Sequence, residues 1–457
     1  MALMIRNTHR LLAIRIALKP ARSGALVEFT AFHGAEALHR QQVPAEAVGI
    51  RSELSVRAYR NAHFQLPPDL THALAAALRD RAQPDEPMWL QVGSSGGHLG
   101  VVPWERLFQP VLQAPLLRVP NFLADPVFLT GPLRLALVVS SPRAKSPFPV
   151  DVYASDLVAR VRQALPQGTE IDLFADVEAY QTLQRLPSLP QHRITVHPPA
   201  QAATFGEGGT VTAPTWDGAL QSPWLRWMVQ ALRGRYVDAV HFVCPGFFRR
   251  DQGALALARS PAENIDREWS HMIGAGELMA FLNTVGAWAV AFTPPFEDVW
   301  AMGVRLLADR LAWQRPGALM VHQTFEDGNA LDAGYRFLFA DHDEPPPRTP
   351  SLMVYAHPKR MPRYRESMAG FEAGHMSLGW RFGAEGEIPE QLEWLARKDD
   401  RESKRLKGPA DEPAWKRTAE LQLDQLLSRL GDEDSPERRG TLDALTRARS
   451  ILERSKS

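Results

Sequence analysis

A histidine and the single cysteine of the chain stand three residues apart and have the types that nucleophilic chemistry needs. His241 lies in an apolar run, Val237–Val243, that reads as a buried strand, and Cys244 follows it directly. A thiolate attacks a carbonyl carbon when a histidine within hydrogen-bond reach takes the thiol proton. Side chains three positions apart in a strand, however, point to opposite faces. The spacing favours a buried thiol and a hydrogen-bonded histidine, and His271 is a second candidate base for Cys244.

Two adjacent carboxylates, Glu297 and Asp298, lie shortly after another apolar run, Ala287–Phe292. The triplet Pro-Pro-Phe directly precedes them. Paired carboxylates at the end of a strand could exchange protons with a substrate or bind a metal ion. They also commonly begin a helix, because negative charge is stabilised at a helix N-terminus. We favour the start of a helix, beside a surface that could still bind a partner.

Metal and cofactor sites are not indicated by the sequence. One cysteine excludes an internal disulfide and a cysteine-cluster metal site. The glycine-rich stretch Gly206–Gly209 lacks the Gly-Lys-Ser/Thr ending of a phosphate-binding loop, so we interpret it as a surface loop. The other histidines lack the short spacings of metal ligands: His271, His322, His342, His357 and His375. We therefore expect no cofactor and no metal.

The composition is that of an ordinary globular protein. Of the 457 residues, 45% are hydrophobic, and Lys plus Arg equals Asp plus Glu at 52 each. A chain without a basic excess is a poor candidate for general nucleic-acid binding. The local basic stretch Pro358–Arg365 reads as a solvated loop. No apolar stretch reaches about 18 residues, so we expect no membrane span and a cytoplasmic location.

Strands and helices alternate from Leu133 onward, which predicts a three-layer α/β fold with a mostly parallel sheet. The predicted strands are Leu133–Ser140, Glu170–Phe174, Ile194–His197, Val237–Cys244, Ala287–Phe292 and Ala318–His322. The predicted helices are Asp151–Leu165, Val177–Leu186, Ser222–Arg233, Glu263–Thr284 and Asp298–Gln314.

The regions on either side differ in pattern. The first 86 residues predict an α+β region, with strands at Leu11–Leu18 and Ala25–Phe29 and a helix at Asp69–Arg81. A β-hairpin is predicted over Met88–Val102, at the start of the main domain, residues 87–340. Residues 341–384 read as a Pro-rich linker with a short strand, Leu352–Tyr355. A charged tail follows at 385–457, with amphipathic helices at 413–430 and 441–454.

Five segments, taken in order, resemble the CHAT peptidases, relatives of caspases and separase. Val102-Pro103-Trp104-Glu105-Arg106-Leu107 is similar to the family's L-P-W-E-x-L, and Val240–Gly246 is similar to its histidine strand. The other similar segments are Leu135–Pro142, Trp288–Pro295 and Gly317–His322, and Gly253–Leu257 continues the histidine segment as its short β-hairpin. The resemblance implies a caspase-like sheet. We expect Trp104 and Glu105 to serve structure, Trp104 by anchoring the hairpin and Glu105 by pairing or capping locally.

The resemblance also implies where a catalytic dyad would lie. In this family a histidine ends one strand and a nucleophilic cysteine ends its neighbour. The histidine position corresponds to Pro245, and the cysteine position to Pro294 or Pro295. Proline supplies neither a nucleophile nor a base, so both chemical groups are missing.

Three hypotheses follow for function. The first is a catalytically inactive CHAT-like protein that regulates or scaffolds a protein partner, such as an active peptidase or an effector, in a bacterial regulatory or defence assembly. Its contact surface would include a cleft at the strand ends near Gly246, Glu297 and Asp298. The second is an active cysteine peptidase with a displaced site built from Cys244 and His241 or His271. The third is an α/β protein that binds a small ligand.

Overall fold

The computed structural model describes residues 11–365, apart from 22–23, 35, 80, 82–85, 94–96, 121–125, 143–147, 206–210, 213–218, 263–269, 296–297, 316 and 326. The chain divides into two compact units, Met1–Glu385 and Gly386–Ser457, and the described residues all belong to the first. The two helices predicted in the tail, the loop at 206–209, His375 and Glu297 lie outside the described residues.

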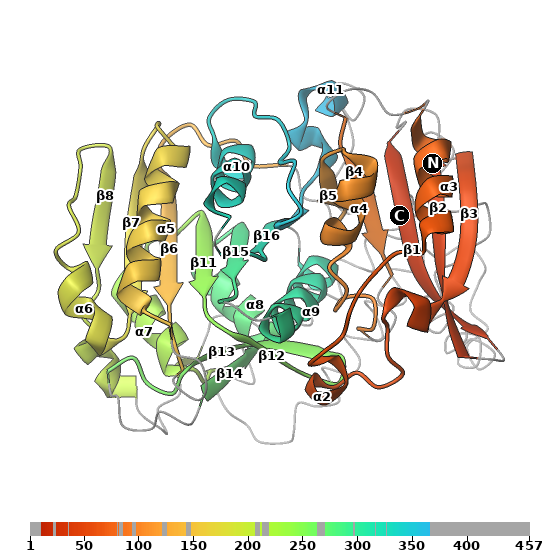
Figure 1. Ribbon diagram of the computed structural model, residues 1–457. Helices are drawn as coiled ribbons and strands as arrows, with labels where there is room; N and C mark the ends of the chain where they lie inside the picture. Colours follow the sequence, from red (N-terminus) through yellow and green to blue (C-terminus); the bar gives the residue numbers. More distant parts are fainter. Residues whose placement is uncertain are drawn as a thin grey trace, which may run out of the picture. The chain divides into compact units, whose positions relative to one another are not determined.

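A twelve-stranded sheet runs through the described part of the chain (Figure 1). In spatial order its strands are β3 (Glu36–Pro44), β2 (Gly24–His33), β1 (Leu12–Ala21), β4 (Met88–Val92), β5 (Leu116–Arg118), β17 (Leu352–Tyr355), β16 (Ala318–His322), β15 (Ala289–Thr293), β11 (Ala239–Val243), β6 (Leu133–Val139), β7 (Thr169–Ala175) and β8 (His192–Val196). The six strands from β16 to β8 are parallel to one another. β17 is antiparallel to β16 but parallel to β5, and β5, β4 and β1 are parallel to one another. β1, β2 and β3 pair antiparallel.

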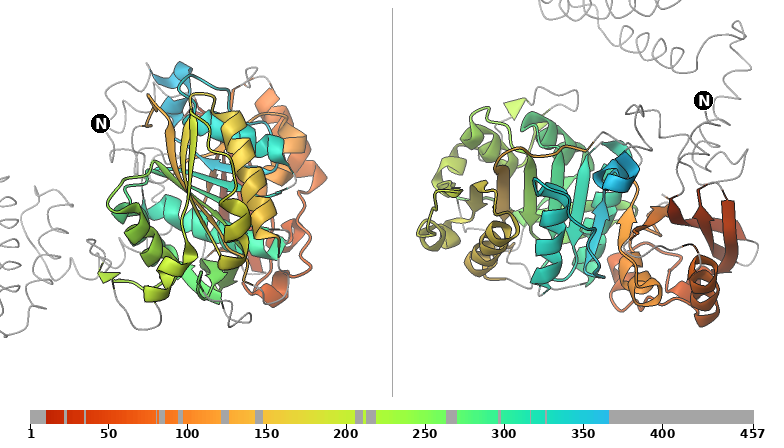
Figure 2. Two further views of the ribbon diagram at one scale, coloured as in Figure 1. Left: turned by 90° about the vertical axis from the view of Figure 1, so that its left-hand side faces the viewer. Right: turned by 90° about the horizontal axis from the view of Figure 1, so that it is seen from above.

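Helices cover both faces of the six parallel strands and make the fold a three-layer α/β arrangement, as predicted. One face packs against α5 (Val150–Ala164), α6 (Val177–Leu183) and α10 (Gly328–Phe339). The other face packs against α7 (Pro223–Leu232), α8 (Ala275–Thr284) and α9 (Asp298–Gln314). Figure 2 (left) shows the strands between the yellow α5 and the green helices. Strands buried on both faces account for the nearly continuous apolar runs in the sequence.

The first three strands and β4 form a separate core with their own helices. Its helices are α2 (Val56–Tyr59), α3 (Pro68–Arg79) and α4 (Trp104–Leu112), and its aromatic centre is Phe29, Trp104 and Phe108. α3 confirms the predicted amphipathic helix, because Leu70, Leu74 and Leu78 are its buried residues. The short remaining elements are η1 (Ala45–Val48), η2 (Pro199–Phe205), η3 (Pro358–Arg360), α11 (Pro362–Arg365), β9 (Val211–Thr212) and β10 (Ala219–Leu220).

A second, three-stranded antiparallel sheet follows β11 directly. It consists of β12 (Gly246–Arg249), β13 (Gln252–Ala258) and β14 (Ser270–Gly274). α9 crosses β12 and β13 at backbone contact: a Cβ on Gly246 would meet the carbonyl oxygen of Trp300 at 2.3 Å, and one on Gly253 would meet that of Gly303 at 2.2 Å. Only glycine permits such an approach.

The six predicted parallel strands, the strands at the two N-terminal positions and the strand at Leu352–Tyr355 are all confirmed. Two predicted elements are wrong. The hairpin over Met88–Val102 contains one strand, β4, while Gly97–Val102 form turns with hydrogen bonds from Gly100 N to Gly97 O (3.0 Å) and from Val102 N to Leu99 O (3.3 Å). The neighbours of β4 are instead the parallel strands β1 and β5.

The predicted helix Glu263–Thr284 is shorter than expected. Residues Ser270–Gly274 form β14, paired with β13, and α8 begins at Ala275. Its predicted first residues, 263–269, lie outside the described residues. The apolar side chains Met272 and Ile273 fit both the two-residue repeat of a strand and the 3.6-residue repeat of a helix. The local pattern therefore did not distinguish a strand from a helix.

Candidate functional site

The ends of β11 and β15 meet at one edge of the sheet. These strands are parallel neighbours, with Val243 opposite Thr293. The residues that follow the two strands are therefore adjacent: Pro245 after β11, and Pro294 and Pro295 after β15. These are the positions that the CHAT resemblance assigns to the catalytic pair. All three prolines are buried, and the carbonyl of Pro245 accepts a hydrogen bond from Ala256 N at 2.8 Å. The two expected positions are adjacent, and neither carries a reactive group.

His241 lies on the face of the sheet that α10 covers. Its Nδ1 is 2.7 Å from the Tyr335 hydroxyl, its Nε2 is 2.8 Å from Thr293 Oγ1, and its ring stacks with that of Tyr335. Both hydroxyls can donate or accept, so either neutral tautomer is satisfied. Complete burial, with a smaller effect from His322, lowers the pKa of His241 to about 3. The imidazole is a neutral, fully bonded structural group at pH 7.

Cys244 lies on the opposite face, in the core beneath α7, α8 and α9. Burial raises the pKa of its thiol far above the ordinary value, so the nucleophilic thiolate is not formed near neutral pH. Among the described residues, no hydrogen bond joins the Cys244 sulfur to a histidine. His271, the other candidate base, lies on β14 with its Nε2 3.8 Å from Glu277 Oε2.

The expected binding cleft at this edge is not open at Gly246. That residue is buried beneath α9, where Trp300 and Val304 leave no room even for a methyl group. Asp298 is the first residue of α9, in agreement with the helix start expected there, although its side chain and Glu297 lie outside the described residues.

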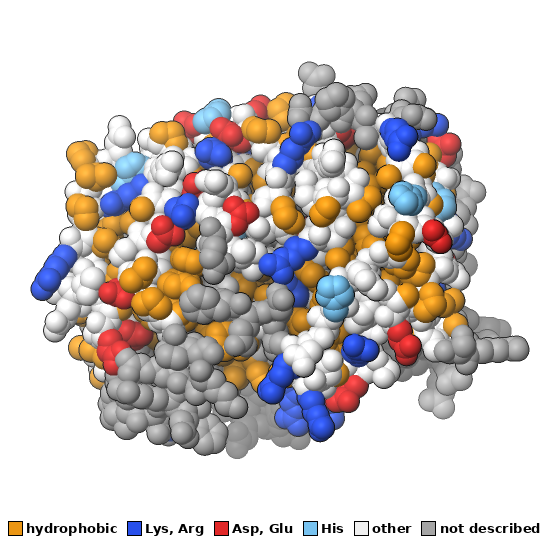
Figure 3. Space-filling model, in the orientation of Figure 1, with side chains coloured by type: hydrophobic (Ala, Val, Ile, Leu, Met, Phe, Trp, Pro, Cys, Tyr) orange, Lys and Arg blue, Asp and Glu red, His pale blue; other side chains and the backbone are white. Residues whose placement is uncertain are grey.

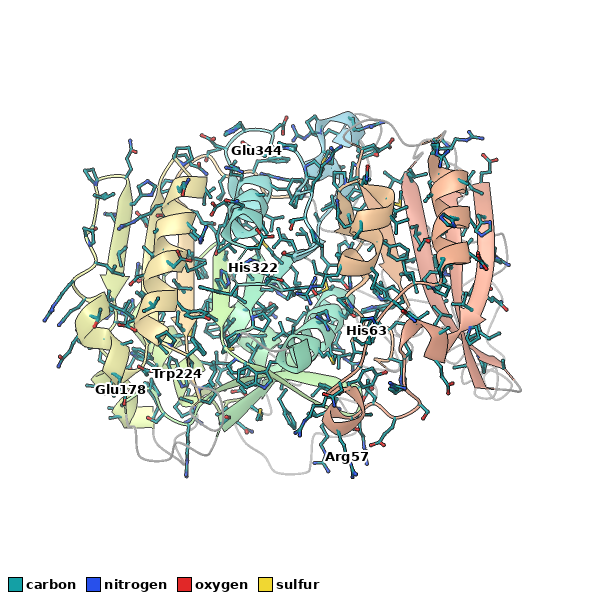
Figure 4. All side chains as sticks on the ribbon, in the orientation of Figure 1. Arg57, His63, Glu178, Trp224, His322 and Glu344 are labelled. Atoms are coloured by element: carbon teal, nitrogen blue, oxygen red, sulfur yellow. The ribbon has the colours of Figure 1, made fainter. Side chains whose placement is uncertain are left out.

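His322, at the end of β16, belongs to a set of polar groups that hold the loop before α10 (Figure 4). Its Nε2 is 2.9 Å from the carbonyl oxygen of Asp327. The Asp327 carboxylate accepts from Ala330 N at 3.1 Å, which caps α10, and from Thr349 Oγ1 at 3.1 Å. These side chains form their hydrogen bonds with the backbone and with one another, so we interpret the set as structural.

Glu105 takes part in a buried charge network. It forms two hydrogen bonds with Arg118, at 2.7 and 3.1 Å, and Arg118 Nη1 lies 2.8 Å from Asp309 Oδ1. The Tyr355 hydroxyl donates to the same carboxylate. Burial alone would lower the pKa of Arg118, but its anionic neighbours raise it well above the ordinary value. The four residues come from α4, β5, α9 and β17, so the network joins the N-terminal core to the parallel strands.

Trp104 lies beside that network at the start of α4. It is fully buried, and its indole N–H donates to the Leu99 carbonyl at 2.9 Å. This bond stabilises the turns that follow β4. Those turns are found where the second strand of the hairpin was predicted. Pro103 precedes the helix, at its N-cap.

The basic stretch Pro358–Arg365 is not the solvated loop that we expected. Arg360 is buried and donates to the carbonyls of Phe337 (2.7 Å) and Ala340 (3.2 Å), which are the last carbonyls of α10. Arg365 pairs with the Asp343 carboxylate through both of its terminal nitrogens, Nη1 and Nη2. A guanidinium that bonds the last carbonyls of a helix stabilises its C-terminus, so this segment completes α10.

Among the residues described, no three His, Cys, Asp or Glu side chains are grouped to hold a metal ion. Nor does this part of the chain contain a helix long and apolar enough to cross a membrane.

Comparison with known proteins leaves the site as the main source of functional information. No protein-family profile matches the sequence, and no curated protein matches it. Among solved structures, a point mutant of the PilB minor pilin from Streptococcus sanguinis is similar over 71% of this chain and 77% of the pilin, at 7% identity and a TM-score of 0.22. Such a low score carries no inference about fold or function.

Proposed function

We propose that this chain is a catalytically inactive protein of CHAT peptidase ancestry that acts in the bacterial cytoplasm by binding a protein partner. It regulates or scaffolds an active peptidase or an effector in a regulatory or defence assembly. The observation that carries the proposal is the register of β11 and β15, which brings Pro245 beside Pro294 and Pro295 at one buried edge. Losing both members of a dyad removes the nucleophile and the base, and with them the mechanism.

The alternative of an active peptidase with a displaced site has little geometric support. Cys244 and His241 are separated by the sheet, and both are fully buried. A substrate carbonyl would have to reach the core to meet the thiol. The small-ligand alternative rests on the α/β architecture alone, with no ligand-binding motif to favour it.

The catalytic part of the proposal is tested with purified full-length chain, denatured casein and a library of quenched fluorescent peptides, with Cys244→Ala as the matched variant. We expect no cleavage above buffer by either protein. Cleavage lost in Cys244→Ala would establish the displaced cysteine site, and cleavage by both proteins would establish another active centre. Either result would overturn the proposal.

The binding part is tested by mixing the chain at micromolar concentration with each protein encoded beside it and measuring mass by light scattering after size-exclusion chromatography. A complex of defined stoichiometry is expected with one of them. Absence of any complex would count against a scaffolding role.

A further inference from the structure

Five arginines lie exposed on two segments that are far apart in the sequence. Arg51, Arg57 and Arg60 are in and around α2, Arg249 ends β12, and Arg250 begins the turn that follows it. In the described part of the chain, no ion pair joins any of their guanidinium groups to a carboxylate. The exposed acids on the same two segments are Glu53 and Asp251. This local excess of positive charge contrasts with the equal numbers of acids and bases in the whole chain.

The two segments are brought near each other by Gly97, in the turn after β4. A Cβ built on Gly97 would meet Leu54 Cδ2 at 2.9 Å and Asp251 Cα at 3.1 Å, so the residues before α2 and the turn between β12 and β13 both pack against Gly97. Figure 3 shows Lys and Arg side chains gathered at the lower edge of this face, over α2 and that turn. Figure 4, in the same orientation, places Arg57 there.

Two exposed apolar side chains, Phe247 and Met272, lie beyond the arginines on the three-stranded sheet. Phe247 and Arg249 share the outward face of β12, because side chains alternate along a strand. Ala254, which is half-buried, and Ala256, which is buried, lie on the same face of β13, and Met272 of β14 pairs with Ala256. Phe247 is 41% exposed and Met272 is 43% exposed. A sheet face open to water normally carries polar residues, so the exposed apolar side chains of Phe247 and Met272 on this face indicate a contact surface.

Charge complementarity selects the class of occupant. Guanidinium groups pair with carboxylates in a bidentate geometry, and an apolar side chain packed beside such pairs commonly anchors an interface. The matching ligand is a segment of acidic residues with an apolar residue among them. A nucleic acid would use the arginines but would leave the exposed Phe247 and Met272 side chains uncovered, and the chain lacks the overall basic excess of such binders.

We propose that the surface formed by these five arginines and Phe247 binds an acidic segment of a protein partner that carries an apolar anchor residue. The proposal rests on the proposed function, since it names the surface and the chemistry of the partner through which a non-catalytic chain would act. The arginines supply long-range attraction, and Phe247 supplies the contact that holds the anchor.

The test measures fluorescence anisotropy of a fluorescein-labelled peptide of glutamates with one phenylalanine and one leucine among them, titrated with the full chain at low and high salt. We expect saturable binding that weakens with salt, and none by the counterpart in which glutamine replaces glutamate. The variant Arg57→Gln/Arg60→Gln/Arg249→Gln should weaken binding about tenfold or more. The control Arg79→Gln/Arg185→Gln/Arg233→Gln removes the same charge from exposed arginines elsewhere and should leave it unchanged.

Phe247→Ser should weaken binding several-fold while its salt dependence stays the same. Equal melting temperatures of all variants would show that folding is intact. The proposal is overturned if the peptide does not bind, if the patch variant and the control variant bind alike, or if a poly-dT oligonucleotide binds more tightly than the peptide and loses its binding in the patch variant. Peptidase activity would overturn the proposed function instead, whatever the peptide result, so the two failures are distinguishable.

Discussion

His241 and Cys244 lie three residues apart in the sequence but on opposite faces of the central sheet. The histidine bonds Tyr335 of α10, whereas the cysteine packs in the core on the other side with residues such as Phe242. The sheet backbone therefore separates the two groups that a cysteine peptidase would need to bring together. This arrangement gives the chain a folded core at the place where the CHAT resemblance predicts a catalytic centre.

Cys244 should resist alkylation in the folded protein. Its thiol is buried and its pKa is raised, so iodoacetamide meets neither an accessible sulfur nor a thiolate. We expect mass spectrometry to find no carbamidomethyl group after exposure of the native chain near pH 7.5, and full labelling in guanidinium chloride. Labelling of the native chain as fast as that of the unfolded chain would show that this core does not exclude the reagent.

His241 should make stability fall with acid. Its pKa lies near 3 in the folded chain and near 6.5 in the unfolded chain, so between these values only the unfolded chain binds the proton. The free energy of unfolding should therefore fall by up to about 1.4 kcal/mol per pH unit as pH drops from 6.5 toward 3 because of this group. Urea unfolding at pH 7.5, 5.5 and 4.5 measures the slope, and His241→Gln should be less pH-dependent than the wild type. Identical slopes would mean that His241 titrates normally.

The Glu105–Arg118 pair should be costly to break from one side. Arg118→Met leaves the Glu105 and Asp309 carboxylates buried without their counter-ion, and we expect a loss of about 3–5 kcal/mol in the free energy of unfolding. Glu105→Gln combined with Arg118→Met should lose less than the sum of the two single changes, because each removes the other's partner. Additive losses in the double-mutant cycle would argue that the pair is not coupled.

Gly246 should not tolerate a side chain. Gly246→Ala places a methyl group 2.3 Å from the Trp300 carbonyl oxygen, so α9 must shift, at an expected loss of about 3 kcal/mol. Gly131→Ala is the matched control, since a Cβ there meets no atom within 4 Å. Chemical unfolding compares the two variants. Equal stabilities would mean that α9 does not lie on β12 as described.

The strands of the main sheet could be predicted from the sequence because they are apolar on both faces and lie between amphipathic helices. β11 and β15 could thus be placed within a few residues, together with the prolines that follow them. Local pattern was insufficient where tertiary pairing decides the structure. Residues 97–102 are apolar enough for a strand but form turns, because β4 already pairs on both sides with parallel neighbours.

The polar contacts of the site could not be predicted from the sequence for a different reason: their partners are far apart along the chain. Arg118 joins Glu105, 13 residues away, to Asp309, 191 residues away, and no local spacing signals such a pair. Likewise, His241 depends on Tyr335 of α10, a helix that contains Gly328 and Gly334 and was not predicted. The five arginines were missed because the residues around α2 and the turn after β12 come near each other, on either side of Gly97, only in the folded chain.

Peptide hydrolysis decides whether this chain is catalytically inactive. Purified wild-type chain and Cys244→Ala are incubated with denatured casein and the quenched peptide library, and cleavage is followed by fluorescence and mass spectrometry. We expect that neither protein cleaves any substrate above the buffer rate, because the strand ends at Pro245, Pro294 and Pro295 carry neither nucleophile nor base. Turnover by the wild-type chain that disappears in Cys244→Ala would contradict it.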